Sequence, residues 1–186
     1  MKRPPFTAYH APLQEGCFYH IFNRSINRES IFFNDRNCDF FLKKIHRYLD
    51  PYLETKAWVL MKNHFHWLVK VREVDHLFLE SIESETTKRA KNFLKDRDIN
   101  LFLEGQFKRL FSSYALAFNK EHERTGSLFQ KRFRRLKLES DMDVYRIMDY
   151  IHQNPVKHGF VTDPGEWKYS SFIDYQKENT IFLPWN

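Results

Sequence analysis

The chain has 186 residues, enough for one ordinary domain with a buried core. Apolar residues make up 42% and charged residues 29%, which excludes a disordered or fibrous chain and favours a globular one. The net charge of +6 is unevenly placed, because residues 105–138 hold nine Lys or Arg against two Glu. Such a basic block indicates a polyanionic partner, although a solvated basic surface would give the same count.

Cysteine usage and hydropathy indicate the compartment. Cys17 and Cys38 have no CxxC spacing, which argues against a disulfide framework and a cysteine zinc site. No apolar run follows the first five residues, and no stretch approaches the roughly 20 apolar residues that span a bilayer. We therefore expect a cytoplasmic protein without a signal peptide or membrane contact.

The first elements in chain order alternate between strand and helix. Residues 1–16 carry three prolines and a glycine and predict a loose N-terminal arm. A β-prone, aromatic run predicts a strand over 17–23, and apolar residues at helical spacing predict a helix over 35–49. Two apolar runs over 56–61 and 64–71, joined by a Lys-Asn turn, predict a hairpin.

The second half continues the alternation after a less certain region. A helix is predicted to begin near Asp75, and the polar segment 83–106 is interpreted as an insertion that is partly helical. A further helix over 107–120 ends at a Thr-Gly pair, and alternating residues over 132–138 predict the last strand. The segment 141–153 has an Asp cap and an apolar stripe, so we expect a final helix that stops before a proline.

The order β-α-β-β-α-β-α predicts an α+β fold. Its first six elements follow the split βαβ, ferredoxin-like pattern, with an antiparallel sheet and helices on one face, and the last helix is extra. We expect a single domain over 17–172, containing the insertion, between the arm at 1–16 and a tail at 173–186.

The first chemical signal is the run His64-Phe65-His66. Residues i and i+2 of a strand point to the same face, so two imidazoles would project together while Phe65 enters the core. Such a pair is half of a site for a divalent cation. Packed or surface histidines would give the same pattern.

The second signal is Tyr150 followed by Asn154. On a helix these positions share one face, which places a phenol beside an amide oxygen that could complete a three-ligand site. The alternative is a tyrosine at a helix edge and an asparagine cap before a proline.

The third signal is the basic, aromatic segment that follows Gly126. Its cations and backbone amides could hold phosphates, and Phe129 could stack on a base. The ordinary alternative is a connection with solvated charges. The candidate phosphate-binding residues are Lys131, Arg132, Arg134 and Arg135.

Together these segments resemble the REP-associated tyrosine transposases, within the broader HUH single-tyrosine transposases. The matching pieces occur in family order and cover most of 17–172; they are residues 18–24, 58–68, 126–133, 150–159 and 167–172. The resemblance implies a ferredoxin-like core in which His64, His66 and Asn154 bind the metal and Tyr150 is the nucleophile. Tyr114 is the rival nucleophile, but its neighbour one turn on is Phe118, so a core role is expected.

The resemblance also implies a mechanism and a substrate. Mg²⁺ or Mn²⁺ would polarise the scissile phosphate of single-stranded DNA near a hairpin or repeat, and attack by tyrosine would give a 5′-phosphotyrosyl link and a free 3′-hydroxyl. Because a phenol has an ordinary pKa of about 10, a cation such as Lys157, also a candidate DNA contact, would help to deprotonate it. The family relationship further implies association with the nucleoid, as a monomer or a homodimer.

Three other classes remain as alternatives. One is a DNA-binding protein without catalysis, which covalent adduct formation would distinguish. Another is an RNA-binding ferredoxin-like module, which would need exposed aromatic pairs on its central strands in a pattern that this sequence lacks. A replication initiator or relaxase of the same superfamily would bring extra domains, for which 186 residues leave no room.

Overall fold

The sheet is the centre of the molecule. The computed structural model describes residues 9–73 and 98–177. Within these ranges four strands form one antiparallel sheet in the order β2-β3-β1-β4. The strands are β1 (Phe18–Arg24), β2 (Leu53–Met61), β3 (His64–Val71) and β4 (Arg134–Leu138). This order confirms the α+β, ferredoxin-like prediction, with β3 and β1 at the centre and β2 and β4 at the edges.

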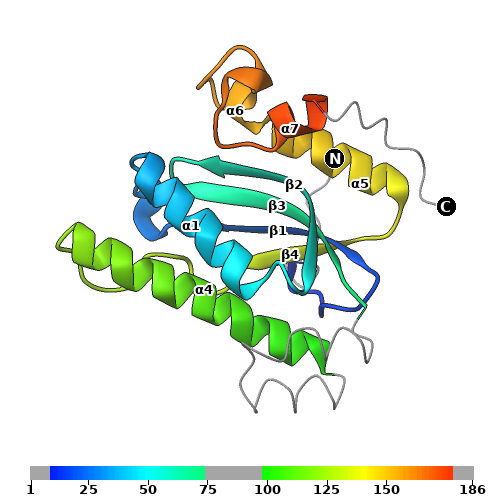
Figure 1. Ribbon diagram of the computed structural model, residues 1–186, viewed down its shortest axis with the longest axis horizontal. Helices are drawn as coiled ribbons and strands as arrows, with labels where there is room; N and C mark the ends of the chain where they lie inside the picture. Colours follow the sequence, from blue (N-terminus) through cyan, green and yellow to red (C-terminus); the bar gives the residue numbers. More distant parts are fainter. Residues whose placement is uncertain (1–8, 74–97, 178–186) are drawn as a thin grey trace.

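Helices cover both faces of the sheet (Figure 1). The long helices α1 (Asp35–Tyr48) and α4 (Ile99–Glu121) pack against each other and share one face. Helix α5 (Asp141–His152) lies across the opposite face and contacts β2, β3 and β4. The short elements are η2 (Ile26–Arg28), α6 (Asn154–Lys157), η3 (Pro164–Glu166) and α7 (Phe172–Lys177).

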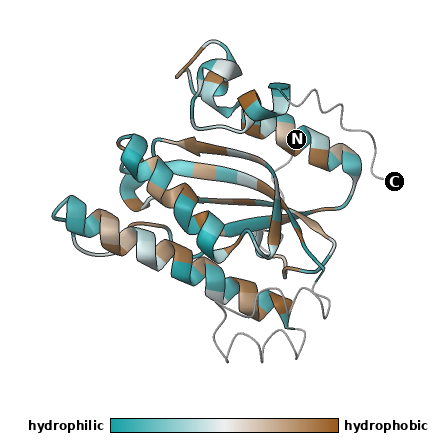
Figure 2. Cartoon of the chain, viewed as in Figure 1, coloured by the Kyte–Doolittle hydropathy of each residue, from teal (hydrophilic) through white to brown (hydrophobic). Residues whose placement is uncertain are grey.

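The sheet buries side chains on both faces, so β1, β2 and β3 each contribute to two cores. Tyr19, Phe65 and Trp67 point toward α1 and α4 and join the larger core. Alternate residues such as Val59 and Leu68 point the other way and pack under α5. Figure 2 shows hydrophobic and hydrophilic residues alternating along the helices, as expected for helices that each cover one face.

Most predicted boundaries agree with the structure, and one differs substantially. Helix α4 begins at Ile99, not at residue 107, so the end of the polar segment 83–106 is helical. Asp98 caps this helix by accepting a hydrogen bond from the backbone N–H of Leu101 at 2.9 Å, and Phe102 is buried in the core. The predicted helix near Asp75 lies outside the described residues.

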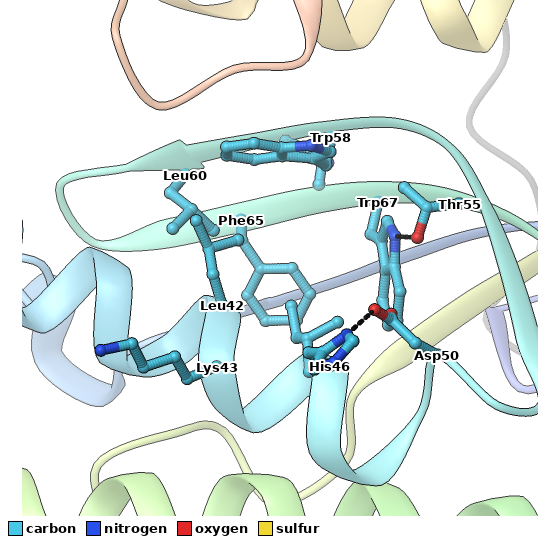
Figure 3. A pocket seen from close by; sticks show the side chains of 11 residues that line it. Leu42, Lys43, His46, Asp50, Thr55, Trp58, Leu60, Phe65 and Trp67 are labelled. Carbon is cyan, nitrogen blue, oxygen red and sulfur yellow. Dashed lines mark hydrogen bonds and ion pairs between the residues drawn. The ribbon is translucent and has the colours of Figure 1, made fainter.

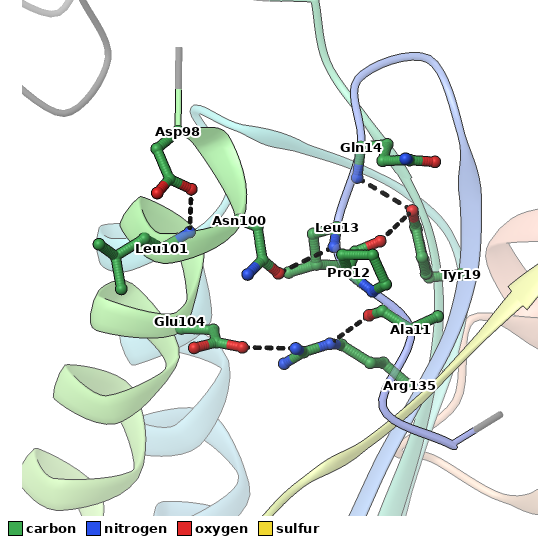
Figure 4. A network of polar contacts seen from close by, with 10 residues as sticks. All are labelled: Ala11, Pro12, Leu13, Gln14, Tyr19, Asp98, Asn100, Leu101, Glu104 and Arg135. Atoms are coloured by element: carbon green, nitrogen blue, oxygen red, sulfur yellow. Dashed lines mark hydrogen bonds and ion pairs between the residues drawn. The ribbon is translucent and has the colours of Figure 1, made fainter. Parts of the chain in front are cut away.

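The described part of the N-terminal arm, residues 9–16, is held against the domain (Figure 4). Leu13 is buried, and its backbone N–H donates to Oδ1 of Asn100 on α4 at 2.9 Å. The hydroxyl of Tyr19 donates to the carbonyl of Pro12 at 2.8 Å. Long-range contacts of this kind leave no trace in local composition, so the prolines predicted a loose arm where the structure shows a packed one.

Candidate metal and nucleophile site

Helix α5 places Tyr150 above the sheet. Its N-terminus is capped by Ser140, whose hydroxyl accepts from the backbone N–H of Asp143 at 3.2 Å. Met148 and Ile151 anchor the helix in the core beneath it. Tyr150 lies in the last turn and is 37% exposed, so its ring contacts the site while a substrate can still reach the phenol.

The structure brings the two predicted histidines together with this tyrosine. His64 and His66 point from β3 toward α5, and their ring centroids are 5.2 Å apart. The ring of Tyr150 meets the ring of His66 edge-on, with 5.3 Å between centroids and an interplanar angle of 82°. Residues separated by more than 80 positions therefore form one cluster.

Asn154 completes the cluster with an unpaired oxygen. The chain turns at Gln153 into the short helix α6, which begins at Asn154, and this asparagine is only 1% exposed. Its Nδ2 donates to the backbone carbonyl of Tyr150 at 3.3 Å, whereas its Oδ1 finds no hydrogen-bond donor within the described residues. A buried carbonyl oxygen without a partner costs about 1–3 kcal/mol, which a bound cation would offset.

Second hydrogen bonds orient both imidazoles. Nδ1 of His64 lies 2.7 Å from Oδ1 of Asn63, and because an amide oxygen only accepts, this nitrogen donates and Nε2 keeps its lone pair. Nδ1 of His66 lies 2.9 Å from Nε2 of His20 on β1. Donation from the far nitrogen to a fixed acceptor is the usual arrangement of metal-binding histidines.

Burial keeps these imidazoles neutral. Desolvation lowers the pKa of His64 to about 4, with His158 lowering it further and the Asn154 side chain raising it. Burial and the neighbouring histidines hold the pKa of His66 well below its ordinary value. Neutral rings have lone pairs available for a cation at pH 7 without losing a proton first.

The donor set fits a divalent cation. Across residues 9–73 and 98–177 no three His, Cys, Asp or Glu side chains are placed to hold a metal ion, so a third ligand from these ranges would be of another type. The orphaned Oδ1 of Asn154 beside His64 and His66 meets that need. Two imidazoles and one amide oxygen could hold a divalent cation and would leave positions open for further oxygen ligands.

Two histidines of this cluster, His20 and His158, were not predicted from the sequence. His20 contacts His66, and the ring centroid of His158 lies 5.4 Å from that of His64. Lys157 was expected, and its Nζ lies 5.1 Å from the ring centroid of Tyr150. The alternation of β1 could have placed His20 on the α5 face, but its position beside His66 depends on the pairing of β1 with β3.

The basic segment divides into exposed and buried parts. Lys131, Arg132 and Arg134 are exposed and can meet a phosphate backbone. Arg135 is 7% exposed and is held by an ion pair with Glu104 and a 2.5 Å hydrogen bond from Nε to the carbonyl of Ala11 (Figure 4). The prediction that Arg135 contacts phosphate is therefore wrong, because its guanidinium is buried and already bonded to Glu104 and to the backbone of Ala11.

Phe129 was also assigned wrongly. It is 7% exposed and packs against Phe41, Phe111 and Tyr114 in the larger core, so it is not available to stack on a base. An aromatic residue next to a basic run is compatible with either role, and only the fold shows which side faces inward.

Tyr114 has the core role that was expected of it. It lies on the other face of the sheet from Tyr150, and its hydroxyl donates to the carbonyl of Ile31. Burial raises its pKa far above that of an ordinary phenol. A buried, hydrogen-bonded phenol with a raised pKa cannot act as the nucleophile in this conformation.

A cavity of about 560 Å³ lies between α1 and the sheet, on the face away from Tyr150 (Figure 3). Apolar side chains such as Trp58, Leu60 and Phe65 form much of its lining. Its imidazole and carboxylate, His46 and Asp50, are paired with each other at 2.8 Å. No tyrosine is among the described residues that line this cavity, and His66, which also lines it, has its ring hydrogen-bonded to His20.

A histidine pair on the central strand of a ferredoxin-like sheet, facing a tyrosine on a flanking helix, is the arrangement that the sequence resemblance implied for HUH single-tyrosine transposases. The chain is 31% identical over 121 residues to a protein of Haemophilus influenzae named "Putative REP-associated tyrosine transposase". That match covers 64% of this chain and 58% of the relative, so the chain spans less than two thirds of the relative's length. No family model matches the chain.

The fold has a solved counterpart. The structure of a REP-associated tyrosine transposase bound to a REP hairpin superposes with a TM-score of 0.64 at 17% sequence identity, covering 100% of this chain and 92% of that one. The resemblance to REP-associated tyrosine transposases is thus confirmed by a relative in sequence, and the fold by a solved structure. Among the described helices, none is both long enough and apolar enough to cross a bilayer.

Proposed function

We propose that this protein is an HUH-type single-tyrosine transposase that nicks and rejoins single-stranded DNA. The observation that carries the proposal is the meeting of Tyr150, the His64–His66 pair and the orphaned buried Oδ1 of Asn154 in one cluster. Phosphoryl transfer without ATP can use a nucleophilic hydroxyl that lies beside a bound divalent cation. This cluster offers the hydroxyl of Tyr150 and three neutral ligand atoms for such a cation. The relative in sequence and the solved counterpart favour the same reaction.

The metal would sit between the sheet and the end of α5. Nε2 of His64, Nε2 of His66 and Oδ1 of Asn154 are the atoms that would hold it, since the other polar atoms of these side chains face protein partners. Mg²⁺ or Mn²⁺ bound there would polarise a non-bridging phosphate oxygen and neutralise the charge that develops on it.

Tyr150 would then attack the phosphorus in line. A bond forms between the phenolic oxygen and phosphorus, the bond from phosphorus to the 3′-oxygen breaks, and the phenolic proton passes to solvent. The products are a 5′-phosphotyrosyl link and a free 3′-hydroxyl, and the link conserves the bond energy for rejoining. The ammonium of Lys157 lies over the face of the Tyr150 ring, where it would attract a phosphate of the bound strand.

The substrate class follows from charge and from the solved counterpart. Lys131, Arg132 and Arg134 are exposed within the most basic stretch of the chain, which suits a DNA backbone. The counterpart is bound to a REP hairpin, so a single strand with a hairpin or repeat is the proposed substrate. One chain supplies Tyr150 and all three ligands, so a monomer would contain a complete site.

The second candidate is a DNA-binding protein without catalysis, which the exposed basic side chains alone would support. The two are separated by incubating the protein with labelled single-stranded hairpins and Mn²⁺ and assaying for an SDS-resistant protein–DNA adduct. We expect an adduct that is lost in EDTA and in Tyr150→Phe and that persists in Tyr114→Phe, the matched control on the other face of the sheet. Tight hairpin binding with no adduct under any condition would establish the non-catalytic binder instead.

A further inference from the structure

A third histidine, His20, lies behind the proposed metal ligands. It projects from the middle of β1 toward α5 and is buried, with Phe22 stacked on its ring at 4.8 Å between centroids. Its Nε2 is 2.9 Å from Nδ1 of His66, and the ring of Tyr150 lies 5.9 Å away between centroids. The proposed function gives His20 itself no role toward metal or substrate.

The contact between two neutral imidazoles allows two arrangements of one proton. If Nδ1 of His66 carries the hydrogen and donates to His20, then Nε2 of His66 keeps its lone pair and can bind a cation. If His20 donates instead, the hydrogen of His66 sits on Nε2, which then has no lone pair for a metal. The acceptor role of His20 therefore decides whether His66 is a ligand.

His64, the other proposed ligand on β3, has the same kind of hydrogen bond at its Nδ1. Nδ1 of His64 donates to Oδ1 of Asn63, so each proposed ligand of β3 has one partner at its far nitrogen. Asn63 comes from the turn before β3, whereas His20 comes from the neighbouring strand. An apolar residue such as Phe or Leu would fill the space among Phe22 and Tyr150 equally well but would offer no acceptor.

We propose that His20 is a positioning residue, which accepts the Nδ1–H of His66 and thereby fixes its ring and tautomer for binding a divalent cation. This inference rests on the proposed function, because it assumes that His66 is a metal ligand. Partners of this kind typically contribute 10–100-fold to metal affinity.

The test is Mn²⁺ affinity of the full chain without DNA, measured by electron paramagnetic resonance of the free ion. His20→Phe and His20→Leu are expected to weaken Mn²⁺ binding by about 10–100-fold. His20→Gln, whose side-chain oxygen can accept near the position of Nε2, is expected to restore most of that loss. Hairpin affinity in EDTA should stay the same in all three, since His20 is buried.

Failure of the proposed metal site and failure of the proposed role of His20 would give different results. If His66→Ala leaves Mn²⁺ affinity unchanged, the proposed metal site itself is wrong. If His66→Ala abolishes binding while His20→Phe and His20→Leu bind as the wild type does, only the role of His20 is overturned. A purely structural role predicts that His20→Gln is no better than His20→Leu.

A measurement on the wild-type chain removes any dependence on folding of the variants. Nitrogen-15 spectra of the imidazoles with bound Mg²⁺ report which ring nitrogen carries hydrogen. We expect Nδ1 of His66 to be protonated and Nε2 of His20 to be an unprotonated acceptor. A hydrogen on Nε2 of His20 pointing at His66 would overturn the proposal.

Discussion

Acid should destabilise the metal-free protein steeply, because the folded chain holds three buried histidines, His20, His66 and His152, and the half-buried His64 in their neutral form. Burial lowers the pKa of His20 to about 3 and those of His64 and His152 to about 4, and it holds that of His66 well below its ordinary value. The unfolded chain titrates near the ordinary pKa of about 6.5. Below pH 6.5 the unfolded state therefore binds more protons than the folded state, and stability falls as the pH falls.

The size of this effect follows from the difference in protonation. At pH 5 the medium is 1.5 pH units below the unfolded pKa and still above the folded pKa values of His20, His64 and His152. Each of these three imidazoles then costs about 2 kcal/mol, so together they cost about 6 kcal/mol relative to neutral pH, and the lowered pKa of His66 acts in the same direction. Because a typical domain has 5–15 kcal/mol of stability in total, we expect the metal-free protein to unfold near pH 5.

The assay is urea unfolding in EDTA from pH 7.5 to 5, followed by tryptophan fluorescence. His152→Gln, which can keep a hydrogen bond to the Ser171 hydroxyl, should reduce the loss of stability between pH 7 and 5 by about 2 kcal/mol. The matched control His46→Gln alters an exposed imidazole on α1 and tests whether any replacement of a histidine gives the same change. A total loss below about 2 kcal/mol would refute the argument, since it would mean that the site is wet enough to protonate its histidines.

Three further predictions concern Phe129, Arg134 and whether one chain holds the complete site. Phe129→Ala should lower stability by about 3–5 kcal/mol through the cavity it leaves, while the folded variant binds hairpin DNA as the wild type does; a selective loss of DNA affinity would restore the base-stacking role. Arg134→Ala should weaken DNA binding across sequences and reduce the slope of log K against log salt by about 1, whereas an unchanged slope would place the DNA elsewhere. Mixing Tyr150→Phe with His66→Ala protein should give no adduct, because one chain holds both residues; recovered activity would mean that two chains share a site.

The local parts of the site could be predicted from the sequence because they depend on fixed periods. Alternation along a strand places His64 and His66 on one face with Phe65 on the other, and the helical repeat places Tyr150 near Asn154. Alternating strand and helix patterns likewise predicted the ferredoxin-like order. These features need only the geometry of a single element, so no knowledge of neighbouring elements was required.

The tertiary structure decided what depends on contacts between elements. The pairing of β1 with β3 puts His20 beside His66, and packing of α4 on the sheet buries Phe129 and engages Arg135. Local composition has no information about such contacts, because the same aromatic or cationic residue suits a core, an ion pair or a DNA surface equally well. The sequence by itself therefore indicated the proposed chemistry and the residues of the candidate site, and only the fold decided which cationic side chains are exposed and which partner orients each histidine of that site.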